Sequence, residues 1–218
     1  MMIDRETPRP TSRIRKGAFR ALIGGAVGYA AAAGLMRFLG SGAVGGLAPS
    51  ATIAALVGVM YCVIAAGIIF GTANPRLGAR FLNVEDADEL REQRKSLLYS
   101  GAAMLLWGGG LIAVALAAPD GPLPQTAALI VGLAGLVAGT AISIPAYRAS
   151  DELMLAVGLE GGAIAFGLAF IVFGLWGMFA HLGFIAGPQP LDLLTLLYVL
   201  VMLASFIAVG RRGMLKIK

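Results

Sequence analysis

The chain has 218 residues, of which 58% are hydrophobic and only 13% are charged, and it contains 31 glycines. A water-soluble domain usually has about 25% charged residues, and a disordered chain combines low hydrophobicity with high net charge. The composition excludes both classes. It predicts an all-α integral membrane protein.

The counts of metal-binding residues exclude further classes of protein. A single cysteine, Cys62, cannot form an internal disulfide, and together with the single histidine, His181, it falls short of the three or four ligands that zinc requires. Iron-sulfur clusters require several cysteines. The sequence therefore predicts neither a metal nor a cofactor.

Six runs with almost no charge are long enough to be membrane spans, because a bilayer core of about 30 Å needs roughly 20 helical residues. The expected spans are residues 21–36, 51–70, 97–117, 126–147, 160–181 and 192–211. The first is short and requires Arg20 and Arg37 to extend toward opposite surfaces. Pro145 is expected to kink the fourth.

These spans pair into three hairpins, and the expected segments follow in chain order. They are a basic tail (1–17), a first hairpin (18–70), a charged loop or helix (71–96), a second hairpin (97–147), a third hairpin (148–210) and a second basic tail (211–218). Ala31-Ala32-Ala33 would fit a signal-peptide cleavage site, but the acidic Asp4 and Glu6 in the segment before it favour a retained span.

The basic residues predict the orientation of the spans. Of the 17 lysines and arginines, only Arg37 lies at the side of the bilayer opposite to the others. By the positive-inside rule, both termini are cytoplasmic. The net charge of +5 is then a topology signal and predicts no binding to nucleic acid. The excess of arginine over lysine, with many alanines and glycines, fits a GC-rich bacterium and therefore its inner membrane.

A short acidic pattern occurs twice, as Asp88-Glu89-Leu90 and as Asp151-Glu152-Leu153. Each copy precedes an expected hairpin, so a parallel duplication is one interpretation. The other is coincidence, since acidic residues favour helix N-termini. Residues 84–96 are expected to form a short charged helix, which would be either a solvated helix start or a docking surface.

Glu160 is the one acidic residue embedded in an apolar helix, and an intramembrane carboxylate is a candidate functional residue. If the helix begins with Ser150 as its N-cap, Glu160 lies about 15 Å along the axis. Two placements remain open: a position near the headgroups, or a buried carboxylate paired with another helix. Glu160 is thus predicted to be a packing or proton-linked residue, with Asp151, Glu152, Asp88 and Glu89 as secondary candidates.

Small and aromatic residues supply the remaining candidates. Glycines at i and i+4 permit close helix packing, and they occur as Gly24/Gly28, Gly67/Gly71, Gly135/Gly139 and Gly158/Gly162. Interfacial anchors are expected at Trp176, His181, Tyr99 and Tyr147. The aromatic residues expected near mid-span are Trp107, Tyr29, Tyr61 and Tyr198, where helix contacts would satisfy their polar groups.

No catalytic motif is present in the sequence. We therefore expect a non-catalytic polytopic membrane protein, an accessory or structural subunit that packs within a larger membrane complex or a homo-oligomer. A small transporter or channel built from repeated hairpins, with Glu160 linked to a proton or solute, is the alternative. A membrane enzyme is the least favoured class.

Overall fold

The computed structural model describes residues 10–41, 46–81 and 87–214, and this part of the chain is all-helical. Within it, six helices are long and apolar enough to cross a membrane. They are α1 (Pro10–Gly40), α2 (Pro49–Ala73), α5 (Arg94–Ala115), α6 (Gln125–Arg148), α7 (Glu152–His181) and α8 (Pro190–Arg211). Two short helices, α3 (Pro75–Phe81) and α4 (Ala87–Glu92), lie between α2 and α5. The prediction of an all-α protein with six candidate membrane spans is confirmed.

Prolines and local caps set where the helices begin. Proline occupies the first turn of α2 and α8, where its missing N–H costs nothing. The N-cap of α7 is Asp151, whose carboxylate accepts a hydrogen bond from the backbone N–H of Met154 at 2.7 Å. The prediction of Ser150 as this cap is wrong by one residue. The Ser150 hydroxyl bonds instead to the carbonyl of Ala146 and to Ser96.

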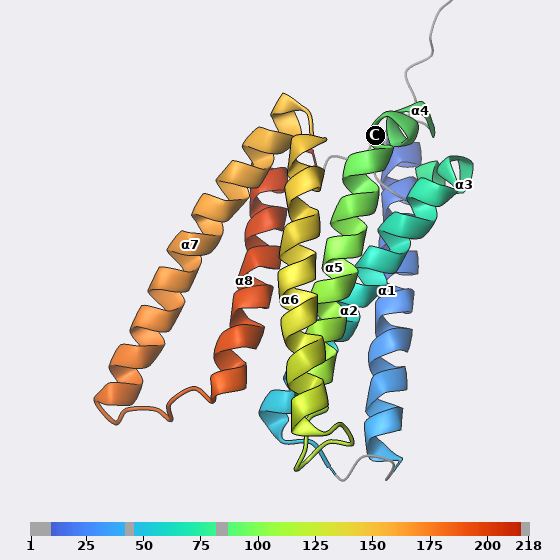
Figure 1. The fold of residues 1–218 in the computed structure, drawn as a ribbon. Coiled ribbons are helices and arrows are strands. Elements are labelled where there is room, and N and C mark those ends of the chain that lie inside the picture. Colours follow the sequence, from blue (N-terminus) through green and yellow to red (C-terminus); the bar gives the residue numbers. More distant parts are fainter. Residues whose placement is uncertain (1–9, 42–45, 82–86, 215–218) are drawn as a thin grey trace, which may run out of the picture.

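Two helices extend beyond the spans expected from charge alone. Helix α1 begins at Pro10, inside the segment expected to be a tail, and α7 has 30 residues. Thirty residues of α-helix measure about 45 Å, which exceeds the hydrocarbon thickness of about 30 Å. Figure 1 shows α7 strongly inclined relative to α8, and inclination is one way for a long helix to fit a bilayer.

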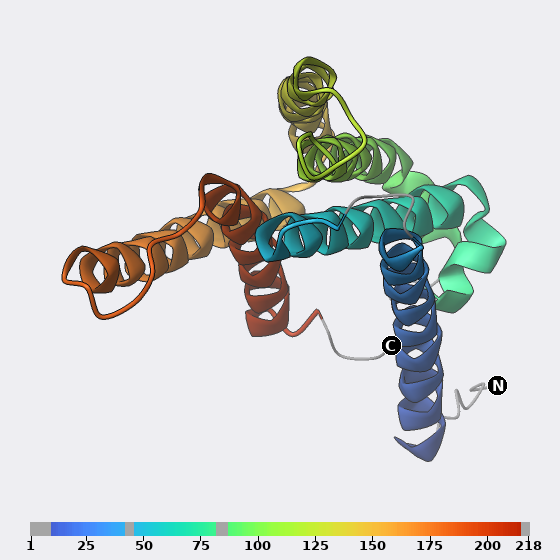
Figure 2. The same cartoon turned by 90° about the horizontal axis from the view of Figure 1, so that it is seen from below.

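The long helices form an open arrangement centred on α2. Helices α1, α5 and α8 pack against α2, while α6 packs on α5 and α7 packs on α8. Seen end-on, α6 and α7 therefore lie outside the central helices, on the far sides of α5 and α8 (Figure 2). Consecutive long helices alternate in direction, so the start of α1 and the end of α8 lie at the same end of the molecule as α3 and α4 (Figure 1).

Glycines allow α5 to approach two helices at once. A Cβ placed on Gly108 would lie 2.7 Å from the carbonyl oxygen of Gly58 in α2. A Cβ on Gly110 would lie 3.3 Å from the carbonyl oxygen of Gly132 in α6, whereas one on Gly109 would meet nothing within 4 Å. Gly108 and Gly110, two of three consecutive glycines, thus allow close packing on opposite faces of α5. Close backbone approach of this kind favours helix association in lipid.

We expect Gly135→Val to destabilise the contact between α5 and α6. A Cβ at this position would lie 2.6 Å from the carbonyl oxygen of Leu106, which belongs to a helical backbone that cannot move easily. Overpacking of this kind costs about 1–3 kcal/mol. Thermal unfolding in mild detergent would measure the loss. The matched control is Gly109→Val, which has open space and should leave the unfolding midpoint unchanged; equal midpoints for both variants would refute the packing assignment.

Candidate functional site

Three aromatic residues from three helices meet near the middle of the molecule. The Tyr61 hydroxyl of α2 donates to the carbonyl oxygen of Tyr198 in α8 at 2.8 Å, and the two rings lie edge to face with centroids 5.2 Å apart. The Tyr198 hydroxyl in turn donates to the carbonyl oxygen of Trp107 in α5 at 3.4 Å. These bonds join α2, α5 and α8 through polar groups that lipid could not satisfy.

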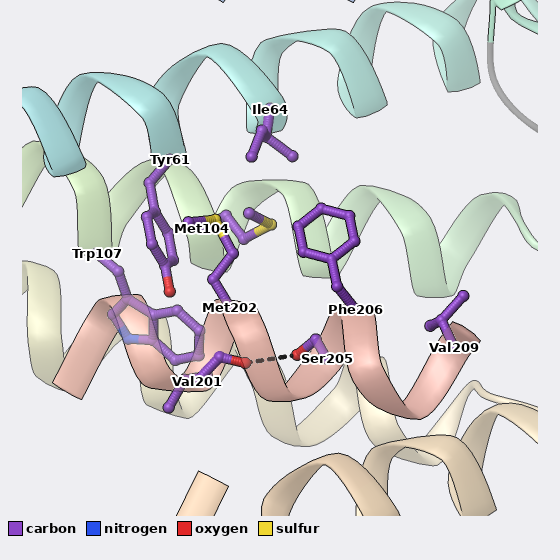
Figure 3. A pocket seen from close by; sticks show the side chains of 9 residues that line it. All are labelled: Tyr61, Ile64, Met104, Trp107, Val201, Met202, Ser205, Phe206 and Val209. Atoms are coloured by element: carbon purple, nitrogen blue, oxygen red, sulfur yellow. Dashed lines mark hydrogen bonds between the residues drawn. The ribbon is translucent and has the colours of Figure 1, made fainter. Parts of the chain in front are cut away.

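Two of the cavities beside this aromatic cluster are lined by both Tyr61 and Trp107. The larger has a volume of about 320 Å³ and lies between α2, α5 and α8. It is lined by Tyr61, Ile64, Met104, Trp107, Val201, Met202, Ser205, Phe206 and Val209, shown in Figure 3. The smaller, of about 150 Å³, also touches Tyr61, Trp107 and Val201 and extends toward Leu136 and Thr140 of α6. Hydrophobic and aromatic side chains dominate both linings.

The serine and threonine hydroxyls around these cavities bond to their own helices. The Ser205 hydroxyl donates to the carbonyl of Val201 at 2.8 Å (Figure 3), and the Thr140 hydroxyl donates to that of Leu136 at 2.8 Å. The Trp107 indole Nε1 is buried and has no hydrogen-bond partner among the described residues, and its ring lies against Gly139 of α6. The cavities are therefore suited to an apolar chain and supply little to an ion.

Glu160 forms a second polar cluster at the end of the molecule where α8 ends. Its Oε2 accepts from Nε of Arg212 at 2.9 Å, and its Oε1 lies 3.3 Å from a terminal nitrogen of Arg211. The carboxylate side chain is 23% exposed. The structure thus combines features of both expected placements: Glu160 is partly accessible and is also paired with another helix. One carboxylate between two guanidinium groups leaves a formal charge of +1 on the cluster.

The other acidic candidates occupy two different settings. Asp88 and Glu89 lie in the first turn of α4, where Asp88 pairs with Arg91 as the helical spacing predicts. Asp151 caps α7 directly, and Glu152 begins that helix. Leu90 is fully buried, whereas Leu153 is 49% exposed. The two copies of the acidic pattern therefore occupy non-equivalent positions in the fold.

The four predicted glycine pairs differ in what they meet. Gly135 and Gly139 both approach α5, Gly158 meets Tyr147 of α6, and Gly78 of α3 packs against Gly71. A Cβ on any of the other four, Gly24, Gly28, Gly67 and Gly162, would meet nothing within 4 Å among the described residues.

The expected interfacial anchors lie near helix ends. Trp176 is in the last two turns of α7, where its indole N–H donates to the carbonyl of Ala186 at 3.0 Å, and the exposed His181 ends that helix. Tyr99 and Tyr147 are each 41% exposed and belong to the second turn of α5 and the last turn of α6, at the opposite end of the molecule. Tyr29, by contrast with the other mid-span aromatics, is 78% exposed.

Sequence reasoning missed the arginines that pair with Glu160 and most of the cavity lining. Arg211 and Arg212 follow Glu160 by about fifty residues, and only the packing of α7 on α8 brings them together. For the cavity, the mid-span aromatics were the available signal. Met104 and Met202 carry no pattern that distinguishes them from other lipid-facing or core methionines.

Among the described residues, no group of three His, Cys, Asp or Glu side chains is placed to hold a metal ion. Comparison with protein-family models, curated proteins and solved structures finds no match to the chain.

We expect Tyr61→Phe to lower stability, because the carbonyl of Tyr198 loses the hydroxyl that bonds to it. The net value of such a bond is about 0.5–1.5 kcal/mol. Thermal unfolding in detergent would report it, with Tyr29→Phe as the matched control because Tyr29 is largely exposed. An equal effect of both substitutions would contradict a specific role for the Tyr61 hydroxyl.

A double-mutant cycle on Glu160→Gln and Arg212→Gln should show that the two residues stabilise the protein as a pair. Partly exposed ion pairs have coupling energies of about 0.2–1 kcal/mol, and we expect the upper part of this range because the carboxylate is mostly covered. Unfolding midpoints of the two single variants and the double variant provide the measurement. Additive effects of the two substitutions would mean that the contact does not stabilise the protein.

Proposed function

We propose that the protein is a non-catalytic accessory or structural subunit of a membrane complex, or of a homo-oligomer, and that α1 and α7 pack against helices outside this chain. The proposal rests on a difference between the glycines of the inner helices, which pack against a neighbouring helix, and those of α1 and α7, many of which face open space. On α5 and α6, most glycines approach the backbone of a neighbouring helix, as Gly108, Gly110, Gly135 and Gly139 do, and Gly109 is an exception. On α7, a Cβ on Gly162, Gly167, Gly174 or Gly177 would meet nothing within 4 Å among the described residues, and the same holds for Gly24, Gly25 and Gly28 on α1.

Glycine is unfavourable in a helix unless another group uses the space that it leaves. It costs about 1 kcal/mol relative to alanine within a helix. In a helix that faced only lipid, nothing would offset this loss of helix stability. Against a partner helix, the glycines would allow the two backbones to pack closely. The middle of α7 also presents large exposed side chains, including Phe166 at 75% and Phe170 at 74%. These features support α7 as a contact helix.

The polar residues near mid-span give little support to the transporter alternative. Thr140, Ser143 and Ser205 all donate to carbonyls of their own helices, and Glu160 is engaged by two arginines. Transporters usually place broken helices or free polar groups at the midplane. The observed bonding therefore favours a packing role over a solute path.

The proposal includes an orientation and a location. The helices would cross as three hairpins with both termini in the cytoplasm of a bacterium, in its inner membrane. Support comes from the distribution of the basic residues. Arg76, Arg91, Arg94, Lys95, Arg148, Arg211 and Arg212 all belong to elements at the end of the molecule that carries α3 and α4 (Figure 1). The positive-inside rule assigns this end to the cytoplasm.

The experiment is purification of the tagged full chain from membranes in mild detergent, followed by native mass measurement and identification of every chain present. We expect an assembly heavier than the 22.4 kDa of one chain. Gly174→Leu should release the partner, because its side chain would occupy the space proposed for a partner helix, while its Cβ would meet nothing within 4 Å among the described residues.

The matched control is Gly109→Leu, which also has open space but lies on α5. It should leave the assembly intact. A wild-type chain that purifies alone as a monomer would overturn the proposal. Proton or solute flux in proteoliposomes, abolished by Glu160→Gln, would replace the proposal with the transporter alternative.

A further inference from the structure

The larger cavity and the Glu160 cluster lie in line along α8. Ser205 and Val209 line the cavity, and Arg212 follows Val209 by three residues, so all three positions share one face of the helix. The guanidinium of Arg212 is therefore attached about one turn beyond the last residue of the cavity. An apolar hollow thus ends beneath a positively charged cluster.

The depth of this arrangement matches one leaflet of a bilayer. From Val201 to Val209 the helix rises about 12 Å, and Arg212 adds about 4.5 Å. Half of a hydrocarbon core measures about 15 Å. A chain lying in the cavity would thus extend from the headgroup level nearly to the midplane, where Tyr61 and Trp107 meet its end (Figure 3).

On one side the cavity is lined by side chains that are exposed at the surface of the molecule and would face lipid in a bilayer. Among its lining residues, Phe206 is 54% exposed and Val201 is 39% exposed. The Ser205 hydroxyl is turned back to its own helix, and the flexible side chains of Met104 and Met202 can adapt to a chain of varying shape. An acyl chain could enter from the bilayer without breaking any hydrogen bond of the protein.

The charged cluster supplies what a phosphate group requires. Arg212 uses its Nε for Glu160, which leaves its terminal nitrogens available among the described residues, and Arg211 is 67% exposed. Glu160 holds both guanidinium groups in place before a ligand arrives, which lowers the entropy lost on binding. Arginine binds phosphate through parallel, charge-assisted hydrogen bonds. The excess charge of +1 favours an anionic headgroup over a zwitterionic one.

We propose that the cavity between α2, α5 and α8 binds one acyl chain of an anionic phospholipid whose phosphate is held by Arg211 and Arg212. The lipid belongs to the leaflet at the end of the molecule where α8 ends. Apart from Glu160, which lies on α7, the residues of this site belong to α2, α5, α8 and the residue that follows α8.

The test reconstitutes the full chain into nanodiscs that contain equal amounts of phosphatidylglycerol and phosphatidylcholine, then transfers it to detergent for native mass spectrometry. We expect one phosphatidylglycerol to be retained preferentially over phosphatidylcholine. Arg211→Gln with Arg212→Gln should reduce this retention by about tenfold or more, since each basic residue near a membrane surface contributes substantially to binding anionic lipid. Inorganic phosphate at equal concentration should not compete, because it lacks the acyl chain.

Three further variants distinguish a loss of lipid binding from a folding defect. Adding Glu160→Gln to the double arginine variant removes the carboxylate that would otherwise be unpaired, and retention should stay low. Val209→Trp fills the cavity while leaving the arginines in place, and should also lower retention. Arg148→Gln, an exposed arginine that ends α6, should change nothing. Equal retention of the two lipids by the wild-type protein, or undiminished retention by the double arginine variant, would overturn the proposal.

Discussion

The close approach of α5 to both α2 and α6 is the contact from which the rest of the arrangement follows. In lipid no hydrophobic force drives helices together, so association depends on packing and hydrogen bonds. Gly58 and Gly108 bring α2 and α5 close, and Gly135 brings α6 against the opposite face of α5. With α5 fixed in this way, Trp107 reaches the centre of the molecule, where the hydroxyl of Tyr198 ties α8 to it.

A second constraint is that buried polar groups must find partners within the chain. The tyrosines near mid-span do so across helices, and this fixes the rotation of α2 and α8 about their axes. Thr140, Thr195 and Ser205 do so within their own helices. The tyrosine hydroxyls are thus used to join helices, and the hollow between α2, α5 and α8 is left with a mainly apolar lining.

Much of the fold could be predicted from the sequence because charges, prolines and glycines mark where an apolar helix can end. Pro49 and Pro190 begin helices as such residues should, and the acidic segment before α5 is helical. Pro145 lies inside α6, which continues for three residues beyond it, as the expected span to residue 147 requires. The predicted N-cap of α7 was wrong by one residue because of a local hydrogen bond. The carboxylate of Asp151, rather than the hydroxyl of Ser150, accepts from the backbone N–H of Met154.

The site was harder to predict because its contacts join residues that are distant in the chain. A glycine pair looks the same in sequence whether it meets a neighbour, as Gly135 and Gly139 do, or open space, as Gly24 and Gly28 do. The sequence likewise shows that Glu160 is a carboxylate in an apolar helix, which is unfavourable, but it does not show which residues pair with it. The structure separates the two ends of α7. Glu160 and Gly161 hold its first part against α8, while a Cβ on Gly174 or Gly177 would meet nothing within 4 Å in the described part of the chain. A helix that is anchored at one end and open at the other keeps its own fold while leaving its far face free for contacts that a single chain cannot supply.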